Sequence, residues 1–236
     1  MNNNIYSASV QPEDIDLTGL VTIPALYRKI ISAVSLNIRK EGYGVDEMAR
    51  RGLTWALARC AVVIFRRPEL YSELSTRVWK GRDDTLCYDR TVEIRDSSTQ
   101  VIGCGITDWC VLDRNTHRPA ASRLESRLEA RDVGCTKPLR LAPFDGGSVV
   151  SGIAGYSECD FNGHLNNCRY VDRFFDLLPD DVTSTSRPQR LDINFKSEIL
   201  RGARITAAIR QSSESRIDFC LRSGASVACL ASLAFI

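Results

Sequence analysis

The chain presents one order of elements twice: a short strand, a helix, and then a run of strands separated by turn residues. In the first half, apolar residues at helical spacing predict a helix over residues 24–40, after a strand near residues 5–10. Further strands are predicted over residues 54–65, 74–79, 87–94 and 101–112. This order is typical of an α+β fold in which a sheet of antiparallel strands wraps around a helix.

The second half repeats the pattern with little residue identity to the first. A strand over residues 148–156 precedes an amphipathic helix over 167–178, and strands are predicted over 191–197, 203–209, 216–221 and 226–235. Between the halves lies a proline-containing stretch whose charged part, residues 123–131, predicts a short helix. We therefore expect one domain over residues 1–120, a connector over 121–146 and a second domain over 147–236.

Composition excludes several classes of protein. The chain has 236 residues, enough for two small domains that bury their own cores. Its formal net charge of +2 argues against a nucleic-acid binder that relies on a basic field. The apolar runs are far shorter than the ~20 residues of a membrane span, and the amino terminus lacks the features of a secretory signal. We expect a cytosolic protein that does not span a membrane.

The nine cysteines are scattered, without a C-x-x-C pair or a Cys/His cluster at zinc spacing. This distribution predicts small buried hydrophobic residues in a reducing compartment. Neither a metal nor an organic cofactor is expected. No G-x-S-x-G elbow, Walker loop or G-x-G-x-x-G motif is present, so serine-hydrolase, nucleotide and dinucleotide functions have no support in the sequence.

Residues 160–167, Asp-Phe-Asn-Gly-His-Leu-Asn-Asn, place an acid, an amide and an imidazole within five positions. If this stretch is extended, its side chains alternate between faces, and Asp160, Asn162 and His164 point to the same side. Asn166 or Asn167 is then suited to cap the following helix. The sequence therefore predicts a cluster of polar side chains at the start of that helix.

This segment fits D-x-N-x-H-x-N-N-x-x-Y and precedes a helix followed by Leu-Leu-Pro, a pattern that resembles the signature of acyl-ACP thioesterases of the bacterial branch. A looser form of the pattern occurs in hot-dog acyl-CoA thioesterases. Blocks in the first half, including G-L-T-W-A-L-A-R at 52–59 and D-W-C-V-L-D at 108–113, also resemble the acyl-ACP family. The resemblance covers about residues 6–119 and 150–199. It implies a tandem hot-dog fold, in which two antiparallel sheets each wrap around a long helix, and it favours acyl-ACP over acyl-CoA.

Thioester hydrolysis needs an acceptor for the proton of the attacking water, a donor for the leaving group and donors for the oxyanion. A histidine can act as base and then as acid near neutral pH, so His164 suits this chemistry. Asp160 and Asn162 would orient the imidazole or a water. Backbone N–H groups at the start of the following helix would receive the oxyanion.

The resemblance adds a second carboxylate, because Phe195-Lys196-Ser197-Glu198 is similar to an aromatic-x-x-Glu segment of the family. It implies that Glu198 is the general base, that His164 and Asn162 bind the thioester, and that Asp160 holds the network. The family has also been discussed as using a cysteine just after this glutamate. That position is Ile199 here, which favours water activation by glutamate and histidine.

Simpler interpretations remain open for each of these residues. An Asp-x-Asn-x-His turn can merely cap a helix, and Glu198 can be a solvent-facing carboxylate. His117, the other histidine, lies in a segment of loop composition. Cys159 and Cys168 flank the motif and leave a Cys/His nucleophilic pair as a remote alternative.

The sequence thus predicts a fatty acyl-ACP thioesterase that releases free fatty acid. An acyl-CoA thioesterase and a hot-dog module that binds acyl chains without cleaving them are the alternatives. The resemblance places the acyl pocket in the amino-terminal half, where Trp55, Leu57 and Val62 are candidates to line it. The expected partner is the acidic acyl carrier protein (ACP), and monomer and homodimer are both open. Arginines near the connector are candidates to bind ACP: Arg114, Arg118, Arg123, Arg127 and Arg131.

Overall fold

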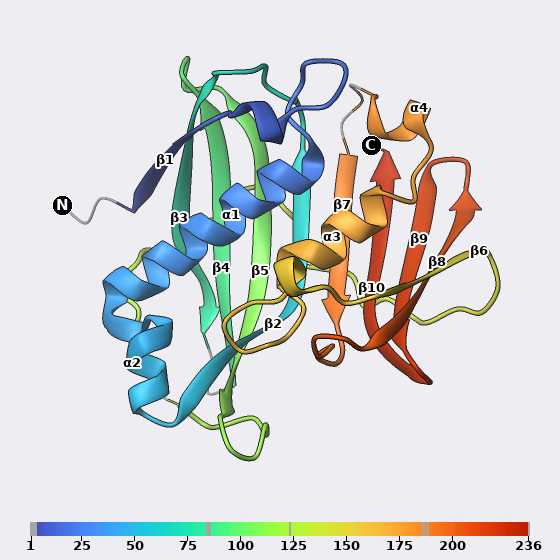
Figure 1. The fold of residues 1–236 in the computed structure, drawn as a ribbon. Coiled ribbons are helices and arrows are strands. Elements are labelled where there is room, and N and C mark those ends of the chain that lie inside the picture. Colours follow the sequence, from blue (N-terminus) through green and yellow to red (C-terminus); the bar gives the residue numbers. More distant parts are fainter. Residues whose placement is uncertain (1–3, 84–85, 123, 186, 188, 236) are drawn as a thin grey trace. The chain divides into compact units, whose positions relative to one another are not determined.

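The computed structural model describes residues 4–83, 86–122, 124–185, 187 and 189–235. The chain forms two compact units, residues 1–138 and 139–236. Each unit is built from an antiparallel sheet with a helix on one face (Figure 1). Arg123, one of the arginines considered above, lies outside the described residues.

The sheet of the first unit has the strand order β1-β3-β4-β5-β2, with every neighbouring pair antiparallel. The strands lie close to the positions that period-two patterns predict, with bounds β1 Ile5–Ser9, β2 Leu53–Ile64, β3 Glu73–Asp83, β4 Cys87–Asp96 and β5 Val101–Asp113. Helix α1, Ile23–Ile38, lies across one face of this sheet and contacts β1, β3 and β4 (Figure 1).

A side-chain cap and a proline stabilise the start of helix α1. The Thr22 hydroxyl accepts the Ala25 N–H at 3.1 Å, and Pro24 occupies the first turn, where a missing N–H costs nothing. Five residues of the predicted apolar stripe are buried against the sheet: Leu26, Tyr27, Ile30, Val34 and Ile38. Ile31, the sixth, is only partly buried. The chain continues through a wide turn, Arg39–Tyr43, into the short helix α2, Val45–Arg50, which the sequence did not predict.

The segment after β5 covers the opposite face of the first sheet. Val133 and Cys135 pack on four buried residues of that face, Ala61, Val63, Cys104 and Ile106. The helix expected over residues 123–131 is wrong, because the described residues 124–131 form no helix. Their backbone instead lies along the sheet edge, where the Lys80 N–H donates to the Glu129 carbonyl.

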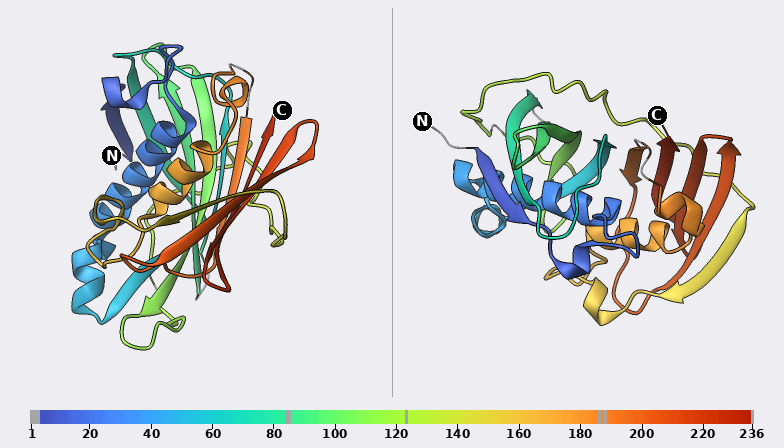
Figure 2. Two further views of the ribbon diagram at one scale, coloured as in Figure 1. Left: turned by 45° about the vertical axis from the view of Figure 1, so that its right-hand side comes forward. Right: turned by 90° about the horizontal axis from the view of Figure 1, so that it is seen from above.

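The sheet of the second unit has the order β7-β10-β9-β8-β6, again antiparallel throughout. The bounds are β6 Ser148–Ile153, β7 Gln189–Phe195, β8 Arg204–Ser213, β9 Arg216–Ser223 and β10 Ser226–Phe235. Helix α3, Asn167–Phe175, is shorter than predicted and packs by stacking Phe174 on Phe219 at 4.9 Å between ring centroids. A second short helix, α4 Asp180–Thr183, follows it. Figure 2 shows both helices on the same side of this sheet.

The segments that lead into α1 and α3 form the same pattern of backbone hydrogen bonds, although few of their side chains are identical. The Asp16 and Asp160 N–H groups donate to the carbonyls four residues later, at 3.0 and 2.8 Å. Gly19 and Gly163, both at φ +78°, close these turns, as only glycine does without strain. Positions 14–29 therefore correspond to positions 158–173, each 144 residues further along the chain.

No helix among the described residues combines the length and the apolar character needed to cross a bilayer.

Candidate active site

The segment that carries the candidate residues is a tight turn, so the extended conformation predicted for it is wrong. Residues 161–163 form a turn in which one Asp160 carboxylate oxygen accepts the Asn162 N–H at 2.9 Å and the His164 N–H at 3.4 Å. An aspartate side chain that bonds to following amides competes with an extended backbone. Strict alternation of faces therefore does not apply here, and Asp160 fixes the turn while Asn162 is exposed.

The turn brings His164 next to Glu198. Leu165 donates its N–H to the Ile199 carbonyl at 2.8 Å, which binds the end of the turn to the segment after β7. In this arrangement His164 Nδ1 lies 3.3 Å from Glu198 Oε1. The His164 side chain is 20% exposed and that of Glu198 is 50% exposed, so solvent reaches the carboxylate. The structure therefore pairs an imidazole with a carboxylate that water can approach.

Tyr170, on α3, supports the segment that carries Glu198, a role that sequence reasoning missed. Its buried ring packs edge-on against Phe195 at 5.4 Å, and its hydroxyl interacts with the Ile199 backbone. Burial raises the pKa of Tyr170 strongly, so the phenol stays protonated at neutral pH. The tyrosine of the D-x-N-x-H-x-N-N-x-x-Y pattern was the signal that could have identified it.

The expected oxyanion donors at the start of α3 are mostly occupied. Asn166 caps the helix by accepting the Cys168 N–H on its side chain at 2.9 Å and the Arg169 N–H on its carbonyl at 2.8 Å. The Asn166 N–H itself donates to the Glu158 carbonyl at 2.9 Å. These three amides therefore already have hydrogen-bond partners and are not free to receive an oxyanion.

An ion pair anchors the candidate site to α3. Arg173 binds both carboxylate oxygens of Glu158, at 2.8 and 2.7 Å, and donates to the Ile153 carbonyl at 2.9 Å. Burial alone would raise the pKa of Glu158, but the bonds from Arg173 and from the Gly155 N–H outweigh burial and lower it. The corresponding pair in the first unit, Lys29 and Asp14, lies at 2.7 Å.

We expect Glu158→Gln to reduce turnover roughly tenfold, because the turn that carries His164 loses its anchor. It should also lower the free energy of unfolding at neutral pH by about 1–2 kcal/mol. A carboxyl group whose pKa is lowered by folding stabilises the folded state at pH values above 4.5, its ordinary pKa. This stabilisation is lost as the pH falls through the pKa of the folded state. The stability difference between the two proteins, measured by denaturant unfolding, should therefore shrink in acid.

The matched control is Asp14→Asn, which removes the corresponding anchor in the first unit. It should lower stability with little change in turnover. A Glu158→Gln variant with unchanged turnover, or a stability difference that grows in acid, would contradict the role of the ion pair.

The other candidate residues have different local surroundings. His117 is exposed in the turn after β5, as its loop composition predicted. Cys159 and Cys168 are partly buried. Trp55, Leu57 and Val62 lie on β2, where Leu57 and Val62 are buried and Trp55 contacts Tyr88 at 5.6 Å between ring centroids.

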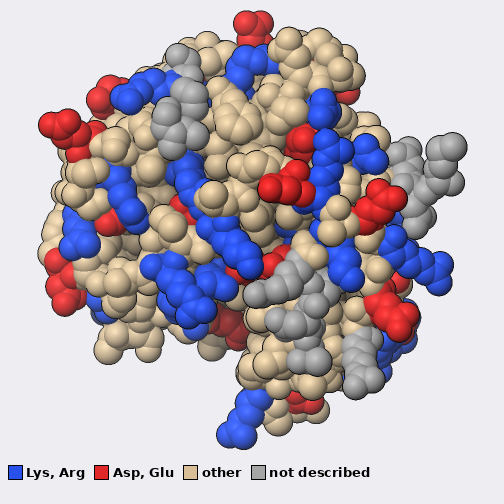
Figure 3. All heavy atoms as spheres, turned by 180° about the vertical axis from the view of Figure 1, so that it is seen from behind, with Lys and Arg blue, Asp and Glu red and all other residues tan. Residues whose placement is uncertain are grey.

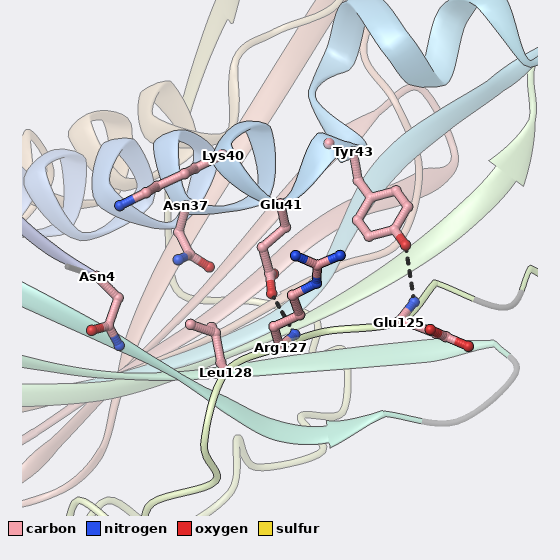
Figure 4. A pocket seen from close by; sticks show the side chains of 9 residues that line it. Asn4, Asn37, Lys40, Glu41, Tyr43, Glu125, Arg127 and Leu128 are labelled. Carbon is pink, nitrogen blue, oxygen red and sulfur yellow. Dashed lines mark hydrogen bonds between the residues drawn. The ribbon is translucent and has the colours of Figure 1, made fainter. Parts of the chain in front are cut away.

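The first unit contains a pocket of about 310 Å³ at the carboxyl end of α1 (Figure 4). Its lining is mostly polar, and Asn37, Glu41 and Arg127 come together there from the helix and from the segment after β5. The Asn37 side chain is 1% exposed, and its Oδ1 has no hydrogen-bond partner among the described residues. This pocket does not supply the apolar tunnel that a fatty chain requires.

Comparison with known proteins identifies the family. The family model for the acyl-ACP thioesterase N-terminal domain matches residues 5–127, and the model for the C-terminal domain matches residues 154–231. A dodecanoyl-[acyl-carrier-protein] hydrolase from Cinnamomum camphora is 23% identical over 180 residues, which cover 70% of this chain and 47% of that protein. An oleoyl-acyl carrier protein thioesterase from Coriandrum sativum is 23% identical over 184 residues, covering 70% of this chain and 50% of that protein. The chain spans about half the length of the curated relatives it matches.

Solved structures confirm the tandem hot-dog fold. An acyl-ACP thioesterase from Bacteroides thetaiotaomicron is similar with a TM-score of 0.90 and 24% identity, covering 99% of this chain and 98% of that one. A 12:0-ACP thioesterase from Umbellularia californica has a TM-score of 0.84 and 17% identity, covering 100% of this chain and 98% of that one. The two domain matches show that the chain belongs to the acyl-ACP thioesterase family.

Proposed function

We propose that this protein hydrolyses the thioester between a fatty acyl chain and the phosphopantetheine arm of ACP, releasing free fatty acid. The observation that carries the proposal is the 3.3 Å contact between His164 Nδ1 and Glu198 Oε1, within the part of the chain that the C-terminal family model matches. A pure binding module has no chemical use for this contact.

In the proposed reaction, Glu198 accepts a proton from water as the water oxygen attacks the thioester carbonyl. His164 directs Nδ1 at Glu198, which leaves Nε2 to donate to the carbonyl oxygen, with the Asn162 side chain as a second donor. When the C–S bond breaks, His164 gives its Nε2 proton to the sulfur while Glu198 passes the proton taken from water to Nδ1, so the imidazole stays neutral. Proton exchange with solvent restores the starting tautomer of His164, and one water has converted the thioester into an acid and a thiol.

Asp160 acts through the backbone in this proposal. Its carboxylate accepts the amides of Asn162 and His164, so it holds both side chains in the turn without touching the substrate. Asp160 is therefore a positioning residue, whereas His164, Asn162 and Glu198 are the residues proposed to contact water or thioester.

The experiment that tests the function measures steady-state hydrolysis of matched acyl-ACP and acyl-CoA panels of increasing chain length by the purified protein. Hydrolysis that favours ACP and disappears in His164→Ala supports the proposal. A preference for acyl-CoA would instead favour the alternative substrate, and acyl binding without hydrolysis would identify a binding module.

We further propose that ACP binds through exposed arginines of the first unit. Arg114, Arg118, Arg127 and Arg131 are all exposed, and Arg131 also lies over the Trp79 ring at 4.9 Å. On the face drawn in Figure 3, basic side chains lie among acidic ones, so a local group of arginines, rather than a uniformly basic surface, would recognise the acidic partner.

Arg114→Glu together with Arg118→Glu should raise the KM for acyl-ACP roughly tenfold and leave hydrolysis of acyl-CoA nearly unchanged. Both arginines lie in the turn after β5, where they have no part in the core. Arg204→Glu, an exposed site on β8, is the matched control and should have little effect. An equal change for both substrates would argue against docking at this turn.

A further inference from the structure

Two cysteines of the first unit face each other across the sheet. Cys87, at the start of β4, is the direct antiparallel partner of Cys110 on β5. In the described strand ladders of this unit, no other pair of cysteines is directly opposed. Both side chains are partly exposed, whereas Cys60, Cys104 and Cys135 in the same unit are buried.

The backbone places this pair at the spacing that a disulfide needs. The Arg114 N–H donates to the Gly52 carbonyl at 2.9 Å, on the β2 side, so even-numbered residues at this end of β5 direct their backbone groups away from β4. The Val111 carbonyl points the other way and accepts the Ala120 N–H at 2.9 Å. Cys110 is therefore a non-hydrogen-bonded neighbour of Cys87, a pairing with Cα atoms about 4.5 Å apart, within the range of disulfides.

The two thiols also contact each other, since the Cys110 side chain forms a hydrogen bond with Cys87. Burial, followed by the neighbouring Cys87, raises the pKa of Cys110 to about 11, so Cys110 keeps its proton at neutral pH. Because a raised pKa disfavours the reactive thiolate, we expect the oxidant to attack Cys87 before Cys110.

We propose that Cys87 and Cys110 form an oxidation-sensitive dithiol that a peroxide converts into a cross-strand disulfide. The peroxide transfers one oxygen to Cys87: its O–O bond breaks, an S–O bond forms and one water leaves. The Cys110 sulfur then attacks the Cys87 sulfur, the S–S bond forms, and the hydroxyl leaves with the thiol proton as a second water. The two thiols lose two electrons and two protons, and hydrogen peroxide is reduced to two waters.

The bond would close the β4–β5 hairpin at its open end. The turn of this hairpin follows Asp96, while Cys87 and Cys110 lie at the opposite end of the two strands. Tyr88 and Trp109, the next pair of opposed residues, contact Trp55 on the helix-facing side. Oxidation would therefore fix the strand ends that carry this aromatic cluster.

The test treats the reduced full-length protein with hydrogen peroxide, alkylates the remaining thiols and maps the tryptic peptides. We expect the loss of two of the nine thiols, a cross-link between the peptides that carry Cys87 and Cys110, and recovery of both thiols with dithiothreitol. Fragmentation of the linked peptide distinguishes Cys110 from Cys104, which shares its tryptic peptide.

Cys87→Ser and Cys110→Ser should each abolish the cross-link, and Cys168→Ser, at another partly buried cysteine, should preserve it. The map of the unsubstituted protein decides the question even if a serine variant does not fold. Retention of all nine thiols at peroxide levels that oxidise free glutathione would overturn the proposal. A sulfenic acid trapped at Cys87 without the cross-link would overturn it as well.

Discussion

Replacing Glu198 or His164 with alanine is expected to lower turnover of acyl-ACP by at least roughly two orders of magnitude, with the fold intact. The first substitution removes the proposed proton acceptor for water, and the second removes the donor for the carbonyl and the leaving sulfur. Both side chains lie at the surface of the second unit, one 50% and the other 20% exposed, so neither change opens a cavity in the core. Steady-state kinetics and circular dichroism of each variant provide the measurement.

Two further variants sharpen this result. Because Glu198 and His164 take part in the same sequence of proton transfers, the double variant should be little worse than either single one. Glu214→Ala, at an exposed glutamate between β8 and β9, is the matched control and should retain full activity. Near-normal turnover of Glu198→Ala would remove this carboxylate from the mechanism and leave His164 as the base.

Arg67→Ala, by contrast, is expected to cause a large loss of stability. Arg67 is buried, donates to the Val21 carbonyl at 2.7 Å and to the Leu20 carbonyl at 3.2 Å, and forms an ion pair with Asp16. The substitution leaves two backbone carbonyls and the partly exposed Asp16 carboxylate without their buried donor, so we expect a loss of about 3 kcal/mol and a Tm lower by about 10 °C. Thermal and denaturant unfolding measure both.

The neighbouring arginine provides the control. Arg66 pairs with Asp96, but its side chain is 50% exposed, and Arg66→Ala should change the free energy of unfolding by at most about 0.5 kcal/mol. Equal effects of the two substitutions would show that the ion pair of Arg67 contributes no more than a surface pair.

The contrast between Arg67 and Glu198 follows from the repeated hydrogen-bond pattern. The Val21 N–H donates to the Pro68 carbonyl at 2.8 Å, as Leu165 does to Ile199, so Arg67 and Glu198 occupy corresponding positions. In the first unit Leu20 stands where the second has His164, and the arginine neutralises the aspartate of the turn. One copy of the turn has thus become a structural anchor, while the other keeps an imidazole beside a carboxylate.

Much of the fold was predictable from local pattern. Apolar residues at helical spacing located α1, and Asn166 or Asn167 marked the start of α3 by capping, because such signals involve only neighbouring residues. The prediction of a helix over residues 123–131 was wrong because it, too, considered only neighbouring residues. Its charged residues have adequate helix propensity, but a sheet edge offers the backbone other hydrogen bonds, and propensity is a weak determinant beside tertiary contacts.

The sequence by itself determined which residues could perform the chemistry, since few segments of a chain place an acid, an amide and an imidazole so close together. Only the tertiary structure decided how they are arranged. Asp160 closes a turn instead of joining an extended face, and Glu198, distant in the sequence, reaches His164 because Leu165 bonds to Ile199. Alternation of side chains is a property of isolated strands, whereas this contact depends on hydrogen bonds between segments that only the folded chain brings together.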